Sequence, residues 1–66
     1  MTYHRPQRTG SRDELTRSLE EMAVGWDHMG RPDKSARAAS AARDLASGAE
    51  VAQVGPVRYV VTDSTV

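Results

Sequence analysis

The sequence predicts an α+β fold in which a two-helix αα-hairpin is followed by a C-terminal β-hairpin, in the order α-α-β-β. Three observations support this prediction. Large apolar side chains recur at helical spacing between residues 15 and 29, residues 33–47 are rich in alanine, and two valine-rich runs flank a single Gly-Pro pair. The first stretch supplies bulk, the second permits close approach, and the third provides further apolar cover.

Length and composition limit the possible classes of protein. A chain of 66 residues makes one domain, which buries only about 60% of the surface that its unfolded chain exposes. The absence of Cys leaves a partner chain as the usual source of added stability. Nine basic and nine acidic residues argue against a protein whose main task is to neutralise a phosphate backbone.

The expected location is the cytoplasm, which is that of the host if the chain is encoded by a phage. No apolar run approaches the roughly 18 residues that cross a bilayer, and the N-terminus lacks the apolar core of a signal peptide. The chain has no Phe, Ile or Asn and one Lys, against eight Arg and nine Ala, which is typical of a GC-rich genome. We therefore expect a GC-rich bacterium or one of its phages as the source.

Residues 1–10 are expected to form a flexible basic arm, and residues 11–66 a single small domain. The arm shows no apolar period and is interrupted by Pro6 and Gly10. An alternative is that its arginines order the arm on an acidic partner or in a nucleic-acid groove. These arginines are Arg5, Arg8 and Arg12.

The first helix is predicted to run from about Arg12 to Met29. Ser11 and Glu14 have the spacing of a capping box, Gly30 fits a left-handed cap, and Pro32 prevents continuation. The apolar stripe that this helix is expected to contribute to the core consists of Leu15, Leu19, Met22, Trp26 and Met29. Gly25 lies beside this stripe, and we expect it to be a notch for a closely packed neighbouring helix.

The second helix is predicted from about Asp33, as a cap or first-turn acid, to Ser47, with Gly48 as its stop. Leu45 is its only large apolar residue. The predicted inner face contains Ala38, Ala42, Leu45 and Ala49. A bulky stripe against an alanine face favours an αα-hairpin.

The β-hairpin is predicted over residues 49–62, with Gly55 at positive φ in a type II′ turn. Val57, Tyr59 and Val61 share one face, so that Tyr59 joins the core, while Arg58, Val60 and Thr62 share the other. We expect Ala49 and Val51 to join the Tyr59 face and Ala52 and Val54 to lie on the opposite one.

An isolated two-stranded hairpin is marginally stable in water, so its edges require cover. Either the hairpin lies across the helix pair of its own chain, or strands of two chains pair into a four-stranded sheet with helices on one face. We favour the second arrangement, which predicts that the fold is completed by homodimerisation.

Little catalytic chemistry is found in the sequence. There is no phosphate-binding glycine loop, nucleophile elbow or metalloprotease motif, and His4 and His28 are the only imidazoles. Adjacent carboxylates diverge around a helix, whereas acid–base catalysis needs them to converge on one cleft. We therefore predict no enzyme activity, no catalytic residue, no metal ligand and no cofactor.

The function predicted first is a small protein-binding module that docks on a larger protein partner as an accessory, inhibitor or assembly protein. Neutral charge, small size and a stripe containing Trp and Met favour this class, because Trp and Met are enriched at interfaces. A small phage virion component is a special case of the same class.

The alternative function is DNA binding. The order of the second helix, the stretch Leu45-Ala46-Ser47-Gly48 and a β-hairpin carrying Arg58 and Tyr59 resembles the C-terminal half of a winged-helix domain. This resemblance implies a small regulator in which Arg37 and Arg43 face DNA and Arg58 contacts a phosphate. The sequence has one helix fewer than that family before the recognition helix, and its neutral charge places this hypothesis second.

Overall fold

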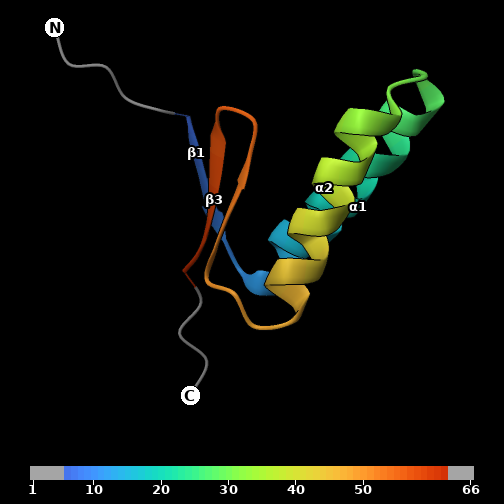
Figure 1. Ribbon diagram of the computed structural model, residues 1–66. Coiled ribbons are helices and arrows are strands. Elements are labelled where there is room, and N and C mark those ends of the chain that lie inside the picture. Colours follow the sequence, from blue (N-terminus) through green and yellow to red (C-terminus); the bar gives the residue numbers. More distant parts are fainter. Residues whose placement is uncertain (1–5, 63–66) are drawn as a thin grey trace, which may run out of the picture.

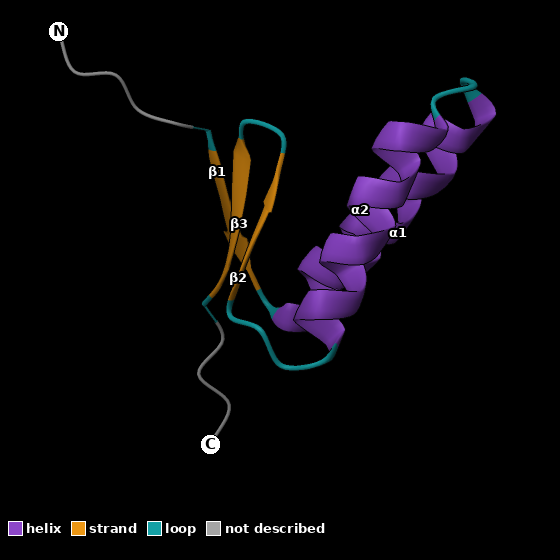
Figure 2. Ribbon diagram, viewed as in Figure 1, coloured by secondary structure: helices purple, strands orange, loops and turns teal. Residues whose placement is uncertain are grey.

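The computed structural model describes residues 6–62, which form two helices packed on one face of a three-stranded sheet (Figures 1 and 2). The elements in chain order are β1 (Gln7–Gly10), α1 (Arg12–His28), α2 (Pro32–Ala46), β2 (Val51–Val54) and β3 (Val57–Val61). The predicted α+β class, with a helix pair followed by a β-hairpin, is confirmed. The N-terminal strand β1 was not predicted.

Strand β1 corrects the prediction of a flexible arm for Gln7–Gly10. It pairs in parallel with β3, so the sheet order is β1-β3-β2. Main-chain hydrogen bonds from Arg58 N–H to Pro6 C=O (3.1 Å) and from Thr62 N–H to Gly10 C=O (2.9 Å) hold the two strands together. The hairpin therefore receives its third strand from its own chain.

Both ends of α1 lie where the cap residues predict. The Ser11 hydroxyl accepts a hydrogen bond from Glu14 N–H at 3.1 Å, and Gly30 has a φ of +76° just after the helix, as a left-handed cap requires. Gly25 is a correction, because it is exposed and a Cβ there would meet no neighbouring atom within 4 Å. It is not a notch for α2.

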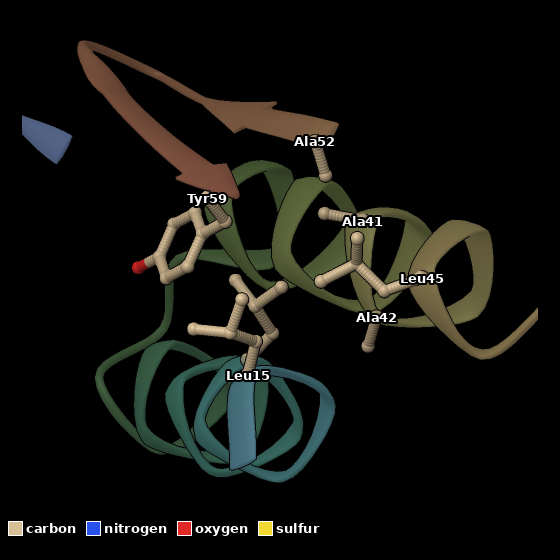
Figure 3. Close-up of a cluster of buried hydrophobic side chains, with 7 residues drawn as sticks. Leu15, Ala41, Ala42, Leu45, Ala52 and Tyr59 are labelled. Carbon is tan, nitrogen blue, oxygen red and sulfur yellow. The ribbon is translucent and has the colours of Figure 1, made fainter. Parts of the chain in front are cut away.

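Helix α2 begins at Pro32, which occupies the first helical turn, while Asp33 is a first-turn acid and not the cap. Its alanine face packs against α1, and the Ser35 hydroxyl adds a hydrogen bond to the Ala23 carbonyl at 2.8 Å. The buried core contains side chains from α1, α2, β2 and β3 (Figure 3). Its members are Leu15, Leu19, Ala41, Ala42, Leu45, Ala52 and Tyr59.

The register of the hairpin corrects the predicted faces of β2. Ala52 lies opposite Tyr59 and Val54 opposite Val57, so Ala52 and Val54 share the core face, and Val51 is 48% exposed. The two-residue turn sets Val54 opposite Val57, and this pairing determines which residues of β2 share the face of Tyr59. Gly55 has a φ of +58°; because Pro56 cannot take a positive φ, the turn is of the predicted II′ type.

The sheet covers only part of the helix pair, and this explains the second half of the apolar stripe. Helix α1 has 17 residues, about 25 Å at 1.5 Å per residue, whereas the longest strand has five. The helices also diverge from the sheet toward the α1–α2 connection (Figure 1). Consequently Met29 is 70% exposed instead of belonging to the core, while Met22 and Trp26 are half-buried.

Arg12 joins the start of α1 to the end of α2. Its guanidinium donates hydrogen bonds to the carbonyls of Leu45 and Ala49, the latter at 2.8 Å. A cation at this position also complements the negative end of the α2 dipole. Arg12, which was predicted as a possible partner contact, thus has a structural role within the fold.

Replacing Arg12 with methionine should destabilise the chain. Methionine keeps much of the aliphatic stem but leaves the carbonyls of Leu45 and Ala49 without this donor, and hydrogen bonds to charged groups contribute about 1.5–3 kcal/mol. We expect urea denaturation, followed by circular dichroism, to show a loss of about that size. Arg17→Met, at an exposed position on the same helix, is the matched control; an equal loss in both variants would contradict the structural role of Arg12.

Candidate functional site

A groove of about 250 Å³ lies between the turn of the β-hairpin and the two helices. Its walls come from elements far apart in the sequence: the second half of α1, the first half of α2 and the β2–β3 turn. The residues around it are Met22, Trp26, Lys34, Arg37, Val54, Gly55, Pro56, Val57 and Tyr59. We call this the Trp26 groove.

The shape of the Trp26 groove follows from local features of the chain. The turn at Gly30 and Pro32 sends α2 back along α1, which brings the first turns of α2 beside the last turns of α1. The tight Gly55-Pro56 turn ends the hairpin opposite them. The sheet and the helix pair diverge toward these ends (Figure 1), and no other helix or strand of residues 6–62 lines the groove between them.

Trp26 and Lys34 form the central contact of the groove. The Lys34 ammonium lies 4.5 Å from the centroid of the Trp26 ring, within the range of a cation–π interaction. Both side chains are half-buried. The indole is therefore held by the fold while part of it faces the groove.

The charge of the groove is one-sided. Lys34 and Arg37 are its only ionisable residues apart from Tyr59, and none of its described lining residues is acidic. The other walls are apolar or main chain, and the volume is below the 300–1,000 Å³ of most small-molecule sites. The arrangement suits one large apolar side chain that has an anionic neighbour.

The arginines that were predicted as contacts and lie within residues 6–62 do not form one surface. Arg37 lines the Trp26 groove, Arg43 lies in a separate hollow between α1 and α2 beside Glu20, and Arg58 is exposed on the face of β3 opposite Tyr59. Arg8 lies on the edge strand β1, and Arg5 lies outside the described residues. Residues 6–62 thus present no single basic face that combines Arg37, Arg43 and Arg58.

The helix pair also differs from the winged-helix arrangement that the sequence resembles. Helices α1 and α2 lie side by side along their lengths (Figure 2), whereas the helices of a helix-turn-helix cross at about 90–120°. In addition, a third strand, β1, joins the β-hairpin and pairs in parallel with β3. Residues 6–62 therefore lack the crossed helix pair that places a recognition helix in a major groove.

Residues 6–62 contain no group of three or more His, Cys, Asp or Glu side chains placed to hold a metal ion. In the same range, neither helix has the length and apolar character that crossing a membrane requires.

Comparison of the chain with protein-family models, curated proteins and solved structures finds no match. The site must therefore be interpreted from its own geometry. Sequence reasoning selected Met22 and Trp26 as core or interface residues but did not single out Lys34, Val54, Pro56 or Val57. A signal for Lys34 exists: it is the only lysine of the chain and lies just after the turn that follows Trp26.

Proposed function

We propose that this protein is a non-enzymatic protein-binding module whose Trp26 groove accepts an apolar side chain of a larger protein partner. The observation that carries this proposal is the half-buried Trp26 ring beneath the Lys34 ammonium in a groove with apolar walls. Tryptophan is among the residues that contribute most to binding when a partner covers them. The groove already has the concave shape and fixed aromatic that such binding uses.

The charge of the groove specifies the partner further. A carboxylate beside the inserted side chain would neutralise Lys34 or Arg37 at the rim, and no acidic lining residue opposes it. We therefore expect the bound segment to combine a Phe, Leu, Ile or Met with a neighbouring Asp or Glu. Such a segment needs no secondary structure of its own to reach the groove.

Selection from a random peptide library displayed on phage tests this proposal. The wild-type chain should enrich peptides in which a large apolar residue adjoins Asp or Glu, and Trp26→Ala should fail to retain them. Trp26 is the only tryptophan, so its fluorescence reports binding of a synthetic, tryptophan-free version of the enriched peptide. Lys34→Glu should weaken this binding about tenfold or more, since it exchanges attraction for repulsion.

Val24→Ala is the matched control, because Val24 is 57% exposed on α1 and does not line the groove. It should bind the selected peptide as the wild type does. Equal retention of the enriched peptides by wild type and Trp26→Ala would reject the groove as the binding site. Salt-sensitive binding to random duplex DNA at 50 mM salt, with no peptide enriched, would favour the DNA-binding alternative.

A further inference from the structure

Within residues 6–62, the unpaired edge of β2 is the least protected edge of the sheet. The hydrogen bond from Val61 N–H to Glu50 C=O and the register turn the main-chain groups of Ala52 and Val54 toward β3. Those of Val51 and Gln53 therefore point away from the sheet. Strand β2 contains no charge and no proline, although charged residues and prolines are the usual means of preventing edge pairing. The opposite edge, β1, carries Arg8 and follows Pro6.

A flank of α2 lies directly below this edge. The side chain of Ala52 points onto Ala41 (Figure 3). Arg37 and Asp44 precede and follow Ala41 by about one helical turn each. Ala39, Ala42 and Ala46 face α1, so at 100° per residue Arg37 and Asp44 are on the flank that faces away from α1. Both are exposed, and within residues 6–62 neither has an ion-pair partner.

We infer that this edge and flank are the interface of a homodimer, in which β2 pairs with β2 of a second copy and α2 packs against its α2. A two-fold axis beside Ala52 and Ala41 makes both pairs antiparallel. It sets Val51 opposite Gln53 of the second copy. It also sets Arg37 opposite Asp44 of the second copy, and Asp44 opposite its Arg37.

Self-complementarity is the reason to choose a second copy as the occupant. An isologous interface requires that a patch match its own image under rotation, and one cation and one anion on either side of Ala41 do so. A foreign strand would satisfy the β2 edge but would give these two charges no defined partners. Ser40 and Ala41 are small, and thus suit helix axes about 8–10 Å apart beneath strands about 4.8 Å apart.

Charge reversal on either side of Ala41 tests this inference. Arg37 also lines the Trp26 groove whereas Asp44 does not, so Asp44→Lys is the variant that leaves the groove unchanged. Sedimentation equilibrium of the wild-type chain should show a monomer–dimer equilibrium. Arg37→Glu and Asp44→Lys should each raise the dimer Kd about tenfold or more, because each places two like-charge pairs across the interface. A mixture of the two variants should dimerise again, since every facing pair then has opposite charges.

Two controls separate the inference from the proposed function and from misfolding. Gln53→Pro should weaken the dimer while circular dichroism stays as in the wild type, because the Gln53 N–H makes no bond to β3. Trp26→Ala should dimerise like the wild type even if it loses the selected peptide. A monomeric wild-type chain at 100 µM, or no dimer in the mixture of folded Arg37→Glu and Asp44→Lys, would overturn the inferred interface.

Discussion

Tyr59→Ala is expected to leave most molecules unfolded at 25 °C. Tyr59 is 1% exposed and is the largest fully buried side chain, and truncation of a large buried aromatic costs about 3–5 kcal/mol. A domain of 66 residues has a total stability of about 3–10 kcal/mol, at 0.05–0.15 kcal/mol per residue. The loss from one substitution is thus comparable with the stability of the whole domain.

The position of Tyr59 in the sheet gives a physical reason for so large an effect. It stands on the central strand β3, between Arg8 of β1 and Ala52 of β2, and its ring extends toward the helix pair (Figure 3). Ala41, Ala42 and Ala52 are too small to fill the space that the ring would leave. The cavity would therefore persist instead of collapsing.

Urea denaturation at one fixed protein concentration, followed by circular dichroism, measures this loss, because a dimer would make stability depend on concentration. Arg58→Ala is the control, since Arg58 is exposed on the same strand and should change stability by less than about 0.5 kcal/mol. A folded Tyr59→Ala chain that is within about 1 kcal/mol of the wild type would show that Tyr59 does not join the sheet to the helices.

The helix ends could be predicted from the sequence because their determinants are local. The Ser11 hydroxyl and the Glu14 amide are one turn apart, and Gly30 needs only its own freedom to adopt a positive φ. The faces of β2 were also within reach of sequence reasoning. A two-residue turn at Gly55 and Pro56 sets Ala52 opposite Tyr59 by counting alone, and our assignment was wrong by one residue.

The Trp26 groove could not be predicted because it depends on packing between residues that are far apart in the sequence. Periodicity places Trp26 and Met29 on the same stripe as Leu15 and Leu19, but it does not show where the covering sheet ends. The contact between Lys34 and Trp26 further depends on the direction that α2 takes after Gly30. Both features are set by packing between distant elements, and they separate the buried half of the stripe from the half that forms a site.

Strand β1 could not be predicted because it too depends on contacts with a distant element. Its pairing with β3 is the basis of the second large effect that we expect. The stretch Gln-Arg-Thr-Gly has no apolar alternation, and strand formation depends more on neighbours than on intrinsic preference. The hydrogen bonds that the Pro6 and Gly10 carbonyls accept from Arg58 and Thr62 determine which residues of β1 face β3. They turn the main-chain groups of Arg8 toward β3 and those of Thr9 to the open side.

Proline scanning of β1 should therefore give opposite results at adjacent residues. Arg8→Pro removes an N–H that faces β3 and should cost about 2–3 kcal/mol, from a lost main-chain bond and an unsatisfied carbonyl on the central strand. Thr9→Pro removes an N–H that faces away from the sheet, where proline is tolerated, and should cost less than about 1 kcal/mol. Arg8→Ala, which keeps the N–H, separates the effect of the main chain from that of the lost side chain. If residues 1–10 were a flexible arm, as the sequence alone indicated, both proline substitutions would leave the stability unchanged. An Arg8→Pro chain as stable as the wild type would therefore show that β1 does not pair with β3 and that β3 is an edge strand.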